Sequence, residues 1–146
     1  MNRIDFQRLA ELRLKEAKTL LSAELPDGAY YLAGYAVECA LKACIAKRTR
    51  EHDFPEKKLV NDSHTHDLGK LLELAGLSDL LKRDVANDEE LKLDWENVRE
   101  WSEQSRYHLY VDDSIGHLHG LLSAKLLIDA VESKEGGMLR WIRQSW

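Results

Sequence analysis

The sequence predicts an all-α protein, a four- to five-helix up-and-down bundle in one domain that spans residues 1–146. Apolar residues recur every three or four positions along most of the chain, as in amphipathic helices, and no run of alternating β-branched residues indicates a strand. Only two prolines and eight glycines interrupt the 146 residues. Polar residues suited to N-caps precede most apolar runs, so the chain divides into helices joined by short loops.

The first two helices are expected at residues 3–23 and from Asp27 onward. Residues 3–23 place apolar side chains at helical spacing, and Pro26 ends that run. Asp27 is a candidate N-cap for the second helix. A stripe of mostly small residues follows: Ala29, Ala33, Ala36, Val37, Ala40, Leu41 and Cys44. Because small side chains let a neighbouring helix approach closely, this helix is expected to be a packing surface.

A polar loop and a shorter helix are expected next. Residues 50–65 form the polar loop, and residues 66–77 indicate a helix with Ser63 or Thr65 as its cap. Gly76 is well placed to end this helix, since glycine adopts the left-handed conformation common there. A further short apolar run follows it.

Two longer helices complete the expected fold. Asn87 or Asp88 caps the first, whose apolar side chains share one face: Leu91, Trp95, Val98 and Trp101. The last long helix opens at Asp112 or Asp113. A glycine pair breaks it and leaves residues 136–146 as a short tail.

The sequence predicts a cytoplasmic protein with no membrane segment. The longest stretch without Asp, Glu, Lys or Arg is Ser114–Ala124, eleven residues, which is too short to cross a bilayer. The first residues lack the apolar core of a signal peptide. Cys39 and Cys44 point to different sides of one helix, so a disulfide is not expected and a reducing compartment fits.

Charge is distributed unevenly along the chain. The net charge is −5, and residues 88–103 account for it with seven acids and two bases. Basic residues cluster at the end of the second helix, where Lys47 and Arg48 are candidate RNA-binding residues. The alternative is that these cations only complement the helix dipole at its C-terminus.

Neither a metal site nor a cofactor is predicted. His117 and His119 stand two residues apart, about 200° around a helix, and cannot share one ion. His64 and His66 could lie together in a loop, where that objection does not apply, but no further residues complete a ligand set. The alternative is that His66 is a first-turn residue of the helix expected at residues 66–77. Cys39 is better explained as a small buried residue than as a nucleophile. No phosphate-binding glycine loop or catalytic triad is evident.

The densest polar grouping lies between the two longer helices, in residues 98–113. It contains Arg99, Ser102, Glu103, Arg106, Tyr107, His108 and Tyr110. Arginine binds phosphate in bidentate fashion, histidine moves protons near neutral pH and tyrosine stacks on bases. These functions suit RNA binding or metal-independent RNA cleavage. The alternative is a polar loop in which Arg106 pairs with a nearby acid.

Three segments in order resemble the HEPN domains of bacterial and archaeal proteins. They read "AYYLAGYAVECALKACIAK", "THDLGKLLELAGL" and "WENVREWSEQSRYHLYVDD". In that family a helix of aromatic and small residues with a Glu-Xaa-Ala-Leu-Lys core precedes a His-Asp-Leu helix. A Trp-Ser-x-x-x-Arg-Tyr-like turn then leads into a long last helix. The resemblance covers about residues 25–135.

The resemblance implies a helical bundle, usually a homodimer, that associates with RNA or nucleotides. Many members are metal-independent ribonucleases of toxin–antitoxin, defence or RNA-processing systems, and others are non-catalytic partners of nucleotidyltransferases. The family's catalytic signature is an arginine, four to six residues and a histidine. Here eight residues separate Arg99 from His108 and one separates Arg106 from His108, so neither pair fits.

These observations leave three readings, of which the first is favoured. In the first, the chain binds RNA or a nucleotide, or it binds a protein partner that is a nucleotidyltransferase or an antitoxin. The residues that would bind RNA or a nucleotide are Tyr107, Ser102, Lys47 and Arg48. In the second, it is a metal-independent endoribonuclease that uses Arg106, His108 and Arg99. In the third, it is a helical adaptor that docks a basic partner on residues 88–103.

The implied dimer has an expected interface. Paired 98–113 segments would face each other across a two-fold axis. Trp95, Trp101 and Tyr107 are the expected apolar anchors, because aromatic groups are the usual anchors of interfaces. Arg99 and Arg106 would compensate the acidic side chains around them.

Overall fold

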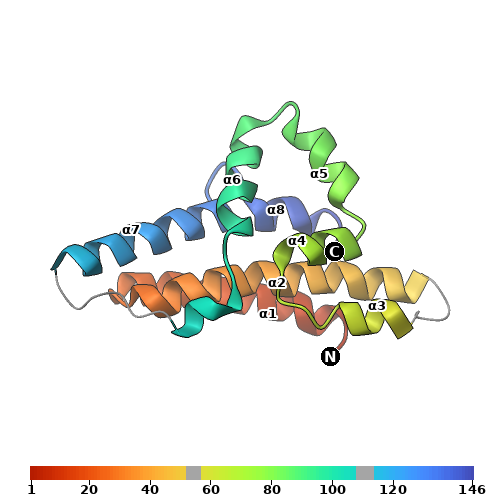
Figure 1. The fold of residues 1–146 in the computed structure, drawn as a ribbon, viewed down its shortest axis with the longest axis horizontal. Coiled ribbons are helices and arrows are strands. Elements are labelled where there is room, and N and C mark those ends of the chain that lie inside the picture. Colours follow the sequence, from red (N-terminus) through yellow and green to blue (C-terminus); the bar gives the residue numbers. More distant parts are fainter. Residues whose placement is uncertain (52–56, 108–113) are drawn as a thin grey trace.

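The computed structural model describes residues 1–51, 57–107 and 114–146, except for the side chains of residues 50, 51, 106 and 107. All regular elements in these residues are helical, which confirms the all-α class (Figure 1). They are α1 (Arg3–Ser22), α2 (Pro26–Glu51), α3 (Lys57–Asp62), α4 (Leu68–Leu74), α5 (Ser78–Val85), α6 (Glu89–Arg99), the 3₁₀ helix η1 (Glu103–Tyr107), α7 (Ser114–Val131) and α8 (Met138–Arg143). Short helices bring the number above the four or five that the sequence indicates.

The helices α1 and α2 form an antiparallel hairpin along the length of the molecule (Figure 1). Asn2 caps α1 in a reciprocal capping box with Asp5. The helix α2 begins at Pro26, so the prediction of Asp27 as its N-cap is wrong. Proline suits a first helical position because the N–H that it lacks has no partner there, and Asp27 instead lies in the first turn, where an acid complements the helix dipole.

The helix α2 is the central element of the fold. It packs against α1, α4, α7, α8 and η1. Its predicted stripe of small residues is confirmed as a packing surface, since Ala33, Ala36 and Ala40 are all 0% exposed. Such small side chains let the other helices lie close to its backbone.

The polar loop predicted at residues 50–65 contains a helix, α3. The cap of α4 is Asp67, whose side chain accepts a hydrogen bond from the backbone N–H of Lys70, and neither Ser63 nor Thr65 holds that position. Past the end of α4, Gly76 adopts a φ of 73°, as expected of a glycine that stops a helix.

The C-terminal part of the chain completes the core. Asp88, one of the two residues predicted for this position, caps α6, and the residues expected to cap α7 lie outside the described residues. Gly137, with a φ of 113°, separates α7 from α8. The short tail helix α8 is a core element, because Met138, Leu139 and Ile142 are all 0% exposed.

The two cysteines are free and buried. Burial raises the pKa of Cys39 and of Cys44 to about 11, so both thiols stay protonated near neutral pH and act as small packing groups. Among the described helices, none combines the length and the apolar character that crossing a membrane requires.

Candidate functional site

The polar centre of the molecule is Glu38, in the middle of α2. Its side chain is 1% exposed, although the helix around it is lined by apolar residues. A buried carboxylate is costly unless it is paired and hydrogen-bonded. Lys42, one turn further along α2, donates from Nζ to Glu38 Oε1 at 2.8 Å. The Glu38–Lys42 pair supplies part of the compensation.

His66, in the connection that precedes α4, supplies further hydrogen-bonding contacts to the buried carboxylate of Glu38. Its Nδ1 lies 3.0 and 3.1 Å from the two carboxylate oxygens of Glu38, and its Nε2 lies 3.1 Å from Glu103 Oε2 in η1. Each of the two ring nitrogens is thus within hydrogen-bond distance of a different glutamate. The ring therefore links α2 to η1.

This network is arranged for hydrogen bonding and not for chelation. The two glutamates approach opposite nitrogens of the ring, so they do not converge on one point. In the part of the chain that the structure describes, no group of three or more His, Cys, Asp or Glu side chains could hold a metal ion.

A second contact fixes the start of η1 on α2. Trp101 is 3% exposed and lies directly against Gly34, where a Cβ atom would come within 2.2 Å of the indole. The Nε1 of Trp101 and the Oγ of Ser105 are buried and have no hydrogen-bond partner among the described residues. The position of η1 is thus set by apolar packing at Trp101 and by the contact of Glu103 with His66.

Beside this contact, aromatic rings line up along α2. Tyr31 and Tyr35 are stacked, with ring centroids 6.0 Å apart and an interplanar angle of 8°. The Tyr31 ring also lies 6.0 Å from that of Trp101, tilted by 33°. Both tyrosines are half-buried, so they form an aromatic surface next to η1 that solvent reaches. Partial burial is the main reason that the pKa of Tyr35 is raised, so this ring stays neutral.

The predicted site residues fall into two separate groups. Arg99 ends α6, Ser102 follows it, and both are exposed beside η1. Arg106 and Tyr107 belong to η1, although their side chains are outside the description, and His108 lies outside the described residues. The structure thus places Arg99, Ser102 and the backbone of η1 in one region.

The other group, Lys47 and Arg48, lies at the far end of α2. Arg48 lies fourteen helical positions beyond Gly34, which is about 20 Å along the helix axis. The Nη1 of Arg48 donates to the carbonyl oxygen of Leu74 at 2.7 Å, so this guanidinium caps the end of α4. The structure therefore does not bring Lys47 and Arg48 together with η1.

The expected dimer anchors need one correction. Trp101 is buried inside its own chain and cannot serve as an exposed anchor. Trp95 is half-buried against the core, and the side chain of Tyr107 is outside the description.

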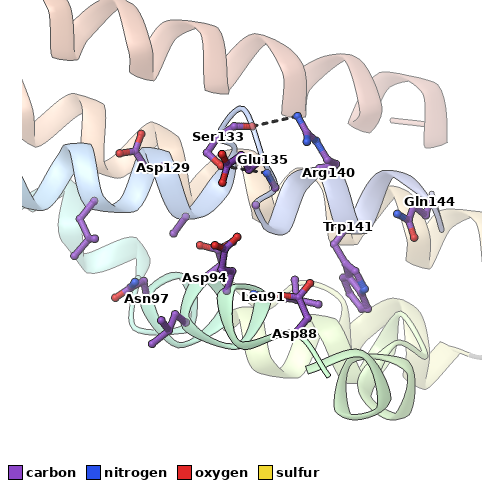
Figure 2. A pocket seen from close by; sticks show the side chains of 16 residues that line it. Asp88, Leu91, Asp94, Asn97, Asp129, Ser133, Glu135, Arg140, Trp141 and Gln144 are labelled. Atoms are coloured by element: carbon purple, nitrogen blue, oxygen red, sulfur yellow. Dashed lines mark hydrogen bonds between the residues drawn. The ribbon is translucent and has the colours of Figure 1, made fainter. Parts of the chain in front are cut away.

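An acidic cavity of about 440 Å³ lies between α6, α7 and α8 (Figure 2). Its carboxylates are Asp88, Glu90, Asp94, Asp129 and Glu135. Arg140 also lines it, but its guanidinium donates to the backbone carbonyls of Ser133 and Lys134. Burial, followed by the nearby carboxylates of Glu90, Asp88 and Asp129, raises the pKa of Asp94 to about 6. A wall of this charge repels phosphates.

Taken together, the fold is an all-α bundle whose central helix carries a buried glutamate linked through a histidine to a short 3₁₀ helix. The HEPN domain model matches residues 5–134 of the chain. The chain belongs to the HEPN domain family, and this confirms the resemblance seen in the sequence. It is accordingly a helical domain of a nucleotide- or RNA-related type. Comparison with curated proteins gave no match, and comparison with solved structures gave none either.

The Glu38–His66–Glu103 network was not predicted from the sequence. In the sequence, Glu38 is part of the family's Glu-Xaa-Ala-Leu-Lys pattern with no assigned catalytic role, and His66 is a possible metal ligand or a first-turn residue. The available signal was a glutamate surrounded by small apolar residues on a packing helix. A charge in such a position must find a buried partner, and histidine was a suitable candidate.

Proposed function

We propose that this HEPN chain binds RNA or a nucleotide at the surface around η1 without cleaving it. We further propose that it works as a cytoplasmic homodimer in a toxin–antitoxin or defence-type module. The partner in such a module is a nucleotidyltransferase or an antitoxin.

The observation that carries this proposal is the placement of η1. Trp101 and Glu103 hold it on α2 beside the stacked rings of Tyr31 and Tyr35. An aromatic face that solvent reaches can stack on an unpaired base, and base stacking is largely independent of sequence. The exposed Arg99 and the arginine of η1 belong to the same segment and can contact phosphate.

The alternative is a metal-independent endoribonuclease. The arginine, tyrosine and histidine at positions 106–108 favour it, because an arginine can stabilise the phosphorane and a histidine can move the proton. In this reading Arg106 contacts the phosphate, His108 is the acid or base, and Arg99 or Tyr107 assists. The spacing of these residues differs from the family's signature, so we favour binding.

One experiment separates the two functions. Purified protein is incubated with a labelled structured RNA in the presence of EDTA, and binding and cleavage are followed in parallel. We expect wild type to bind without cleavage, and Arg106→Ala to weaken binding about tenfold through the loss of a charged phosphate contact. Arg8→Ala removes the same charge from the exposed side of α1 and is the matched control.

Two results would change the conclusion. RNA cleavage in EDTA that His108→Ala abolishes would establish the endoribonuclease instead. An absence of RNA binding by wild type, or an equal effect of Arg106→Ala and Arg8→Ala, would reject the proposed binding surface.

The homodimer is best supported by an exposed apolar stripe on α7. Four side chains of this helix stand three or four positions apart and are strongly exposed: Ile115 80%, Leu118 57%, Leu122 61% and Leu126 57%. Beside them, Lys125 and Asp129 neutralise each other in an ion pair of 2.8 Å. In a two-fold dimer a face meets its own copy, so a neutral apolar face is self-compatible whereas the acidic face of α6 is not.

A further inference from the structure

A second cavity, of about 330 Å³, lies between the start of α1, the second half of α2 and the connection from α3 to α4. Figure 1 shows these segments gathered around the N-terminal end of the chain. Its polar lining includes Arg3, Lys42 and His64, and its apolar lining includes Phe6, Ile45 and Ala46. The volume is at the lower end of the range found for small-molecule sites.

The charge of this cavity is suited to an anion. None of its described lining residues is a carboxylate, in contrast with the five carboxylates of the cavity between α6, α7 and α8. Lys42 donates to Glu38, but an ammonium carries three N–H donors and this side chain is 18% exposed. His64 is exposed at the rim.

Arg3 is the residue that most directly indicates a ligand. One of its terminal nitrogens donates to the backbone oxygen of Trp146 at 2.9 Å, which holds the side chain in place. Its Nε is buried and has no hydrogen-bond partner among the described residues. A buried guanidinium N–H without an acceptor is unfavourable, and a phosphate oxygen would satisfy it.

The apolar lining adds a second element of recognition. Phe6 is half-buried, so part of its ring is available for stacking, and Ile45 and Ala46 complete the apolar side. A ligand that matches both halves carries an anionic phosphate at one end and a flat apolar ring system at the other. A nucleoside monophosphate has this composition.

We propose that this cavity binds a 5′-phosphorylated nucleoside, with the phosphate at Arg3 and Lys42 and the base against Phe6. The same chemistry occurs in a free nucleotide and in the phosphorylated 5′ end of an RNA. The proposal rests on the proposed function in that both take a nucleotide-derived ligand. The cavity is also linked to the Glu38–His66–Glu103 network, because Lys42 lines it and donates to Glu38.

The test measures binding by calorimetry with about 1 mM ligand. The ligands are adenosine 5′-monophosphate, adenosine, inorganic phosphate, and a short RNA with either a 5′-phosphate or a 5′-hydroxyl. Two variants alter the cavity in different ways. Arg3→Met removes the guanidinium, and Ala46→Phe fills the space without changing charge. Arg8→Met is the matched control for charge on the same helix, and thermal unfolding verifies that each variant is folded.

The monophosphate should bind more tightly than adenosine and than inorganic phosphate, and both cavity variants should weaken its binding about tenfold or more. If the RNA end is the ligand, the 5′-phosphate RNA should bind at least about tenfold more tightly than the 5′-hydroxyl RNA, and Arg3→Met should remove that difference. Arg8→Met should leave every affinity unchanged.

The proposal is overturned if neither phosphorylated ligand is preferred, or if folded Arg3→Met and Ala46→Phe bind as wild type does. RNA binding at η1 that persists in that case would leave the proposed function standing. Conversely, nucleotide binding that the cavity variants abolish, in a protein that does not bind RNA through Arg106, would support the cavity and reject the η1 surface.

Discussion

The contact between Gly34 and Trp101 permits a quantitative test of how η1 is held on α2. In Gly34→Ala, the new Cβ would lie 2.2 Å from Cγ and Cδ2 of Trp101 and 2.3 Å from Cδ1. Side chains do not tolerate contacts this short, and an indole is rigid, so the ring must leave its position. Trp101 is 3% exposed, so a displacement of its ring would break almost all of its buried contacts.

The expected loss is about 2–4 kcal/mol of unfolding free energy. Removing a buried tryptophan costs about 3–5 kcal/mol. Alanine offsets about 1 kcal/mol of this, because it favours a helix over glycine by that amount. For a chain of this size the net loss lowers the thermal midpoint by roughly 4–16 °C.

Urea and thermal denaturation, followed by circular dichroism, measure the change. Gly28→Ala is the matched control, since it lies in the same helix and its Cβ would meet only the flexible end of Leu20 at 3.0 Å. The control should be neutral or slightly stabilised by the gain in helix propensity. If Gly34→Ala were as stable as Gly28→Ala, the account of how Trp101 holds η1 on α2 would be refuted.

Two further predictions concern the dimer and the acidic cavity. Leu122→Glu places a charge in the middle of the apolar stripe on α7 and should prevent two copies from packing there. Light scattering should therefore find a dimer for wild type and a monomer for the variant. A monomeric wild type would contradict the proposed dimer. Because the folded-state pKa of Asp94 is raised from 3.8 to about 6, its contribution to stability is fully present below pH 3.8 and is lost as the pH rises through 6. Asp94→Asn should therefore be more stable than wild type at pH 7, by up to about 1 kcal/mol after screening by solvent, and most of this difference should be lost at pH 4. Equal urea midpoints at pH 7 would contradict the raised pKa.

The all-α class could be predicted from the sequence because helical periodicity is local. Apolar residues three and four positions apart define a helix face whatever the rest of the chain does. The same locality explains why Asp88 was correctly expected to cap α6, since a cap contacts only the next turn. Where several local solutions compete, the prediction was less accurate: Asp67 caps α4 in place of Ser63 or Thr65.

The candidate site could not be predicted in the same way. Glu38 and His66 stand 28 positions apart in the chain, and Glu103 is farther still. No spacing rule connects residues at such separations, because their proximity depends on how α4 and η1 pack on α2. The sequence singled out the segment from Arg99 to His108 as a candidate site, which stays a prediction, and it did not indicate that Trp101 is buried.

The sequence by itself thus determined that this chain is helical and where most of its helices lie, and it showed the resemblance to the HEPN family. Periodicity, capping and motif order depend only on residues that are close together in the chain. Only the tertiary structure decided that Glu38 is buried and paired with Lys42 and His66, that the tail helix α8 belongs to the core, and that Arg3 lines a cavity free of described carboxylates. Those features depend on which surfaces exclude water from one another, and that is settled when distant helices pack together.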